Sequence, residues 1–187
     1  MRKTIGLILC GICLVGVGQT APATQPSSGF ANITVSEMKV EDLQGFPFLH
    51  FTRTTTINAM MQTMGTDISD MVGAMKVRGI TPRGPIVILM HGVTDDRNHP
   101  FELQVGFKVN AGVSAPPGYQ LTDLPSTKCA VSIYSGPLMQ VRAAYQKIYP
   151  GIFGAGLTPN GNIREYILYY EDVDSPNNVA MAAVEVQ

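Results

Sequence analysis

The chain has 187 residues, of which 45% are hydrophobic and 14% are charged, and its formal net charge is −1. This length favours a single domain, because domains commonly contain about 100–200 residues. Proteins that bind nucleic acids usually carry a basic patch, and a nearly neutral chain with no basic cluster argues against that class of partner.

The N-terminus has the three parts of a secretory signal peptide. Arg2-Lys3 is basic, Ile5–Gly18 is apolar and uncharged, and Ala21-Pro22-Ala23 places small residues before a cleavage bond. We expect residues 1–23 to be removed and the protein to be exported to the periplasm or the extracellular space. A retained N-terminal membrane anchor is the alternative, although the apolar run is shorter than the about 20 residues that span a bilayer. After signal removal we expect no stable membrane span.

Removal of the signal changes the charge and the cysteine count. Loss of Arg2 and Lys3 reduces the 13 basic residues to 11, against 14 acidic residues, so the mature net charge becomes −3. Cys129 remains as a single cysteine, which excludes an intramolecular disulfide. We interpret Cys129 as a small buried residue of a strand, with a reactive thiol as the alternative.

The rest of the chain is expected to form one domain over residues 33–187. Residues 24–32 are polar and contain proline and glycine, which predicts a flexible linker before it. Runs of alternating apolar residues, or of β-branched and aromatic residues, predict strands. The strands are expected at residues 33–40, 46–56, 85–92, 101–109, 119–124, 127–134, 163–170 and 179–186.

Two helices are expected between these strands. Apolar residues at steps of three and four, many of them methionine, predict an amphipathic helix over residues 57–79. Its methionines are core filler, or else an adaptable wall for apolar ligands. A second helix is predicted over residues 137–149, with Pro137 at its first position, and Pro150-Gly151 should weaken or end it.

The order of elements repeats within the chain. The predicted helices start at residues 57 and 137, and the strands that follow them start at 85 and 163. We therefore expect two strand–helix–strand–strand units, over about 33–110 and 115–187. Such units predict an α+β fold with an antiparallel sheet, two helices on one face and a ligand groove between the repeats. The face without helices is expected to curve into a concave surface between the halves.

Three segments carry a family resemblance. Phe101–Val109 is similar to a strand motif F-x-x-E-V-G-x-P-V, and Leu124–Val131 followed by Tyr134–Pro137 is similar to L-P-A-x-x-x-A and H-x-G-P. Asn162–Glu165 is similar to a strand that ends in a functional carboxylate. In this order the segments resemble those of GyrI-like and AraC-type effector-binding domains, over residues 33–187. The SOUL haem-binding proteins share this duplicated fold and are the main alternative.

The resemblance implies a pocket between the repeats with a buried glutamate, here Glu165, that receives cationic or polar groups of aromatic ligands. A carboxylate in an apolar strand needs a partner, which agrees with this role. By alternation Glu165 shares its face with Ile163, Ile167 and Tyr169, while residues 164 and 166 point the other way. The alternative is that Glu165 lies on a solvated face and contacts nothing.

Four positions depart from the family pattern. Ile167 stands where the family often has tyrosine, Gln104 replaces an acidic residue, Lys108 replaces proline, and Tyr134 replaces histidine.

The expected ligand-binding residues combine the family pattern with alternation. They are Glu165, the hydroxyls of Tyr134 or Tyr169 within its reach, Ile167 and Gln104.

Neither a metal nor a cofactor is expected. His91 and His99 flank Asp95-Asp96, but no metal-site spacing is met, so a solvated turn is favoured over a metal site. His50 is interpreted as a strand histidine with satisfied hydrogen bonds, rather than as an axial haem ligand of the SOUL kind.

Two function classes remain. The first is a non-catalytic sensor or scavenger of a small amphipathic molecule, cationic or aromatic, outside the cytoplasm. The second is a hydrolase of strained electrophilic molecules, as among stand-alone members of the resembled family, in which Glu165 and a nearby tyrosine would activate a water molecule. A protein-interaction module is a third reading, which a large exposed apolar patch would favour. Most resembling domains are fused to a DNA-binding segment, and we expect none here.

Overall fold

A computed structural model of the chain describes residues 33–94 and 96–187. The expected signal peptide and linker lie outside the described residues. The strands are Thr34–Val35 (β1), Lys39–Leu43 (β2), Phe46–Thr55 (β3), Ile86–His91 (β4), Phe101–Lys108 (β5), Gln120–Leu124 (β6), Thr127–Ser135 (β7), Pro159–Tyr169 (β8) and Val179–Val186 (β9). The helices are Met60–Val77 (α1), the short 3₁₀ helix Leu138–Gln140 (η1) and Arg142–Gly154 (α2). None of these helices is long and apolar enough to cross a membrane.

All described strands belong to one antiparallel sheet with the same arrangement in each half. The strand order is β1-β7-β9-β8-β4-β5-β3-β6, and β2 also pairs with β7. In the first half β5 pairs with both β3 and β4, and in the second half β9 pairs with both β7 and β8. The halves join where β4 pairs with β8. The predicted α+β fold of two strand–helix–strand–strand units is confirmed.

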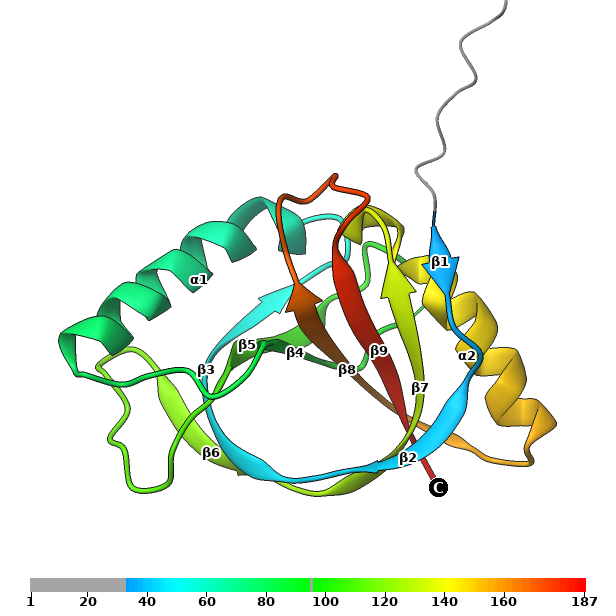
Figure 1. The fold of residues 1–187 in the computed structure, drawn as a ribbon, viewed down its shortest axis with the longest axis horizontal. Helices are drawn as coiled ribbons and strands as arrows, with labels where there is room; N and C mark the ends of the chain where they lie inside the picture. The colour runs from blue at the N-terminus through cyan, green and yellow to red at the C-terminus, as the bar shows by residue number, and fades with distance from the viewer. Residues whose placement is uncertain (1–32, 95) are drawn as a thin grey trace, which may run out of the picture.

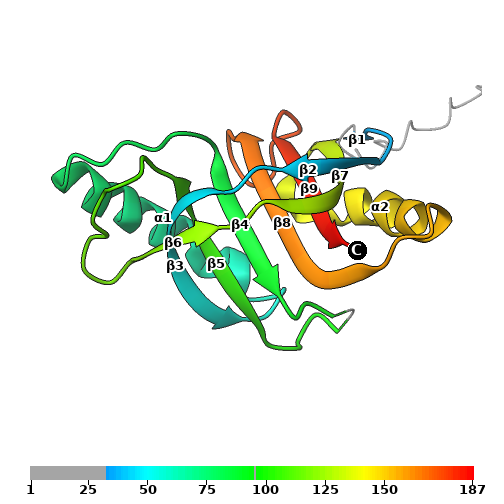
Figure 2. The same cartoon turned by 90° about the horizontal axis from the view of Figure 1, so that it is seen from below.

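Both helices lie on the same face of the sheet, as expected. Figures 1 and 2 show α1 and α2 at opposite ends of the molecule, with β4 and β8 between them. Met71 and Met75 of α1 and Ile148 and Ile152 of α2 are fully or almost fully buried and belong to one core cluster with this face of the sheet. A stretch with apolar residues at helical spacing folds this way because the sheet buries its apolar stripe.

The opposite face of the sheet is crossed by a two-stranded ribbon. β2 continues into β3 through Gln44-Gly45, and β6 continues into β7 through Pro125-Ser126. Because β2 pairs with β7 and β3 pairs with β6, these two long segments run antiparallel around a common corner. The Gly45 N–H donates a hydrogen bond to Ser126 Oγ at 2.9 Å across that corner. Figure 1 shows the ribbon as a curved pair of strands that connects the two halves.

Small apolar clusters fill the space under the ribbon. One contains Phe48, Val87, Leu89 and Tyr166, and the other contains Cys129, Val131 and Ala183. Cys129 is completely buried, and burial raises the pKa of its thiol to about 11. The interpretation of Cys129 as a buried strand residue is therefore confirmed, because a protonated, inaccessible thiol is a poor nucleophile.

The helix boundaries differ from the prediction at both helices. α1 spans residues 60–77 rather than 57–79. The second helix begins as η1 and continues through Pro150 to Gly154, so Pro150-Gly151 does not end it and the predicted end at residue 149 is wrong. Ile148 and Ile152 are both completely buried on either side of the proline. Packing of these two residues outweighs the cost of about 3 kcal/mol that an interior proline imposes.

Candidate functional site

A pocket of about 830 Å³ opens between α1 and α2, where the two halves of the sheet meet. Its floor comes from β4 and β8 and its walls come from the two helices. Its apolar lining includes Ile57, Met60, Met64, Ile88, Met90, Val93, Leu138, Met139, Val141, Phe153, Ile163 and Ile167. The expected groove between the repeats therefore exists, and it lies on the face that carries the helices.

Glu165 lies at the floor of this pocket with 6% of its surface exposed. The Tyr145 hydroxyl on α2 donates a hydrogen bond to Glu165 Oε1 at 2.5 Å. Burial raises the pKa of Glu165, while the hydrogen bond from Tyr145 opposes that rise. Glu165 is the only carboxylate among the lining residues, which also include Arg97 and Arg142, and it forms no ion pair with a described residue. The predicted burial of Glu165 is confirmed; its role in binding stays a prediction.

Tyr145 stays protonated in this arrangement. Burial raises the pKa of Tyr145 well above its usual value, and the adjacent negative charge and hydrogen bond of Glu165 raise it further. Tyr145 is thus a fixed donor to the carboxylate, which holds Glu165 Oε1 in place and leaves Oε2 as the atom available to a ligand.

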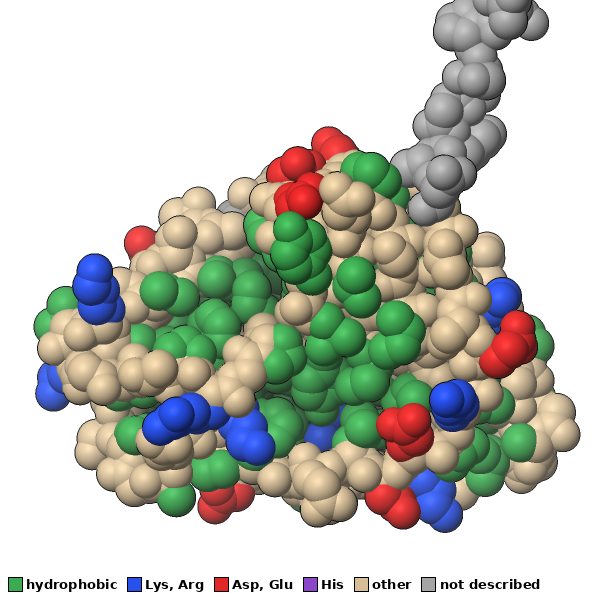
Figure 3. Space-filling model, viewed as in Figure 1, with side chains coloured by type: hydrophobic (Ala, Val, Ile, Leu, Met, Phe, Trp, Pro, Cys, Tyr) green, Lys and Arg blue, Asp and Glu red, His purple; other side chains and the backbone are tan. Residues whose placement is uncertain are grey.

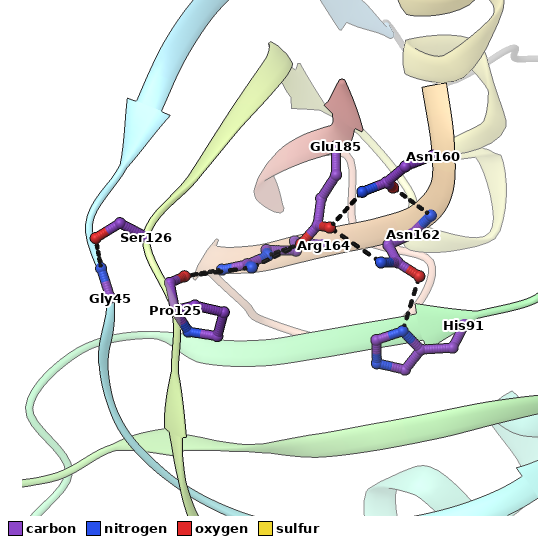
Figure 4. Close-up of polar contacts among 8 residues, drawn as sticks. All are labelled: Gly45, His91, Pro125, Ser126, Asn160, Asn162, Arg164 and Glu185. Carbon is purple, nitrogen blue, oxygen red and sulfur yellow. Dashed lines mark hydrogen bonds and ion pairs between the residues drawn. The ribbon is translucent and has the colours of Figure 1, made fainter. Parts of the chain in front are cut away.

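The side chains that alternate with Glu165 along β8 anchor the strand on the opposite face. The Arg164 guanidinium contacts Glu185 Oε1 at 2.6 Å, and only 3% of the Arg164 side chain is exposed. Asn160 and Asn162 donate to Glu185 Oε2 at 2.9 and 3.0 Å, and the Pro125 carbonyl of the ribbon corner accepts a hydrogen bond from Arg164 (Figure 4). This network fixes the rotation of β8 and therefore directs Glu165 toward the pocket.

Glu185 has an electrostatic environment opposite to that of Glu165. Burial would raise the pKa of Glu185, but hydrogen bonds from Asn160, Asn162 and Arg164 and the charge of Arg164 together lower it. Glu185 is therefore an ionised structural partner of Arg164.

Three of the predicted binding residues lie outside the pocket. Tyr134 is completely buried, and its hydroxyl donates to the Pro137 carbonyl at 2.6 Å. Tyr169 is 52% exposed and donates to Glu171 at 3.0 Å, because an irregularity between Ile167 and Tyr169 breaks the alternation. Gln104 is placed on the other face of β5 and donates to Glu102 at 2.8 Å.

Ile167 does line the pocket, as predicted, and Tyr145 takes the place of the expected tyrosines. The sequence places Tyr145 among the apolar residues of the second helix. That position does not show which strand residue the Tyr145 hydroxyl contacts. Met60 and Met64 of α1 also line the pocket, together with Met90 of β4, which supports the wall interpretation for part of the methionine stripe of α1.

His50 and His91 have hydrogen-bonding partners within the fold. His50 is 1% exposed, stacks on Phe48 at 4.8 Å between ring centroids, and has the hydroxyls of Thr52 and Thr122 at its two ring nitrogens. Burial lowers the pKa of His50. The interpretation as a satisfied strand histidine is confirmed. Among residues 33–94 and 96–187, no group of three or more His, Cys, Asp or Glu side chains could hold a metal ion.

Comparisons with known proteins identify the fold. No protein-family model and no curated protein matches the sequence. The EcmrR C-terminal domain superposes with a TM-score of 0.67 at 14% identity, over 81% of this chain and 97% of that domain. The chain spans 57% of the longer EcmrR chain seen in a complex with DNA.

Two further solved structures share the fold. SAV2435 bound to tetraphenylphosphonium gives a TM-score of 0.58 at 12% identity, over 81% of this chain and 94% of that one. A hydrolase from Listeria innocua gives 0.55 at 10% identity, over 81% and 92%. The chain therefore shares the fold of these proteins.

Proposed function

We propose that the protein is a GyrI-like effector-binding domain that binds a small amphipathic molecule with a cationic or aromatic group in the pocket between α1 and α2. The observation that carries the proposal is Glu165. A buried carboxylate without an ion-pair partner is costly, and a ligand cation supplies the missing partner. The pocket of about 830 Å³ falls within the range of about 300–1,000 Å³ of small-molecule sites.

The walls of the pocket favour apolar groups of varied shape. Met60, Met64 and Met90 present flexible thioethers, which adapt to irregular ligands and make favourable contacts with aromatic rings. SAV2435, which shares the fold, binds tetraphenylphosphonium, an aromatic cation. We further propose that the protein acts as a sensor or scavenger of that molecule. The signal-like N-terminal sequence supports a location outside the cytoplasm.

A charge-matched pair of probes tests the proposal. Tetraphenylphosphonium and tetraphenylborate have nearly the same size and shape and opposite charges. We expect the phosphonium to bind saturably and to shift the NMR signals of the Met64 and Met90 methyl groups, because these residues line the pocket. The borate should leave both signals unchanged. Equal binding of both ions in this pocket would refute a role for the Glu165 charge.

Hydrolysis is a second candidate, which the contact between Tyr145 and Glu165 favours. Glu165, with its raised pKa, is suited to orient or deprotonate a water molecule, and the hydrogen bond from Tyr145 would hold the carboxylate in place for that step. Styrene oxide, a strained aromatic electrophile, is a suitable substrate probe. Formation of the diol by the wild-type protein, lost in Tyr145→Phe and in Glu165→Gln, would support hydrolysis. Saturable binding without product supports a binder.

A further inference from the structure

A second hollow lies on the face of the sheet opposite to the helices. It has a volume of about 300 Å³ and lies beside the corner of the ribbon. Val87, Tyr166 and Met181 form its floor, and Leu43 and Phe46 of the ribbon form a wall. Figure 3 shows hydrophobic side chains gathered in a hollow at the centre of one face, with lysine and arginine side chains at its edge.

Two cationic residues line this hollow. The Arg83 backbone N–H donates to the Lys108 carbonyl at 2.8 Å, which fixes the two residues side by side. Arg83 Nε donates to Asn110 Oδ1 at 3.0 Å, and Lys108 Nζ lies 5.6 Å from the centroid of the Phe46 ring. Both Arg83 and Lys108 line the hollow.

No negative charge balances this pair. The lining of the hollow contains no carboxylate, and neither Arg83 nor Lys108 forms an ion pair with a described residue. An anion at the hollow would be attracted by both cations. An arginine fork also binds a carboxylate through two parallel hydrogen bonds.

We infer that this hollow is a second ligand site, which takes a single short alkyl chain that ends in a carboxylate. The chain would lie on Val87, Tyr166 and Met181, and the carboxylate would contact Arg83 and Lys108. The volume is at the lower end of the range of about 300–1,000 Å³ for ligand pockets, which selects a small molecule. The hollow shares no lining residue with the Glu165 pocket, so this inference does not depend on the proposed function.

Methionine methyl groups report on the two sites separately. Met181 lines the second hollow, whereas Met64 and Met90 line the first pocket. In methyl-labelled protein we expect octanoate, below its micelle concentration, to shift the Met181 signal saturably. Octylammonium, which has the same chain and the opposite charge, should not shift it. The inference is overturned if octanoate leaves Met181 unchanged, or if octylammonium shifts Met181 equally.

Matched variants test the role of the two cations. Lys108→Gln and Arg83→Gln should each weaken octanoate binding by about 1.5- to fivefold, the range expected for an exposed ion pair. Binding should also weaken at high ionic strength, which screens exposed charges. Lys76→Gln removes an exposed lysine of α1 that is outside the hollow, and it should leave the affinity unchanged. Unchanged octanoate affinity in both hollow variants would contradict the assignment of the carboxylate to Arg83 and Lys108.

Discussion

At the scale of single residues, β8 carries two ionisable groups side by side with opposite functions. Arg164 points under the ribbon and is neutralised by Glu185, whereas Glu165 points into the pocket and contacts the neutral Tyr145. The charge that holds the strand is therefore paired, whereas the carboxylate that faces the pocket has no ion-pair partner among the described residues. A carboxylate in that second position is suited to a ligand rather than to stability.

Acid should weaken binding of an aromatic cation through Glu165. Because burial raises the pKa of Glu165, its carboxylate is protonated at a higher pH than an exposed glutamate. We expect tetraphenylphosphonium affinity, measured by titration calorimetry, to fall as the pH decreases through that raised pKa. The affinity of Glu165→Gln should stay nearly constant over the same range. A wild-type affinity independent of pH would contradict the assignment.

The same shift has a consequence for stability. The folded state binds the Glu165 proton more tightly than the unfolded chain does, so this group's contribution to the free energy of unfolding falls as the pH rises from the usual glutamate pKa through the raised value. The Glu165→Gln variant does not lose stability in this way as the pH rises, and its side-chain carbonyl still accepts the hydrogen bond from Tyr145. Its melting temperature at neutral pH should therefore equal or exceed that of the wild type. A clear decrease would indicate that the charge stabilises the fold.

The sequence could identify Glu165 but not its partner. A carboxylate in the apolar strand that includes Ile163 and Ile167 is visible in the pattern, and alternation places all three side chains on one face. The irregularity after Ile167 is not visible, and it removes Tyr169 from that face. The approach of Tyr145 to Glu165 depends on how α2 packs on the sheet, which periodicity does not specify.

At the scale of elements, the ribbon connects the two halves at a tightly packed corner. A Cβ atom on Gly45 would lie 2.5 Å from the Leu124 carbonyl oxygen and 2.8 Å from the Ser126 nitrogen, both of them backbone atoms. The sequence predicts a turn in each of the two segments that form the corner. The sequence does not predict that the two turns pack against each other, because residues 81 positions apart meet there.

Gly45→Ala should therefore destabilise the protein. Backbone atoms at the corner cannot move aside easily, and overpacking commonly costs about 1–3 kcal/mol. Gly73→Ala is the matched control, because a Cβ there meets nothing within 4 Å and alanine favours the interior of α1. Chemical denaturation should show a lower free energy of unfolding for Gly45→Ala and an equal or higher one for Gly73→Ala. Equal stability of Gly45→Ala and the wild type would show that the corner adapts.

The ion pair under the ribbon gives a second prediction at this scale. Glu185→Ala leaves the Arg164 guanidinium buried without its partner, which typically costs about 3–5 kcal/mol. The double variant Arg164→Met with Glu185→Leu removes both charges and should recover most of this loss. Because the pKa of Glu185 is lowered in the folded state, its stabilising effect is lost as the pH falls through that lowered value. A Glu185→Ala protein as stable as the wild type would contradict this account.

At the scale of the whole molecule, the pocket follows from the duplication. Each half contributes one wall helix and one floor strand, and the two floor strands pair with each other. The repeated order of elements made this architecture predictable from the sequence. The helix-bearing face as the site of the pocket was not predictable, because it depends on the separation of α1 and α2 across the sheet.

The proposal of an exported protein is tested on the native material. The basic segment and apolar run at the N-terminus predict a mature chain that starts near Thr24. N-terminal sequencing of protein recovered from its host should give that start in an exported fraction. An intact Met1 on protein from the cytoplasm would remove the proposed location and leave the pocket proposal unaffected.

Titration of tetraphenylphosphonium into wild-type, Glu165→Gln and Glu41→Gln proteins tests the central claim most directly. Glu41 is an exposed residue of β2 outside the pocket, so Glu41→Gln makes the same change in net charge without changing the pocket. Loss of a desolvated partner for a bound cation costs about 2–5 kcal/mol, so Glu165→Gln should weaken binding at least about tenfold. Glu41→Gln should bind as the wild type does. Equal affinities of Glu165→Gln and the wild type would contradict the claim that the buried carboxylate anchors the ligand.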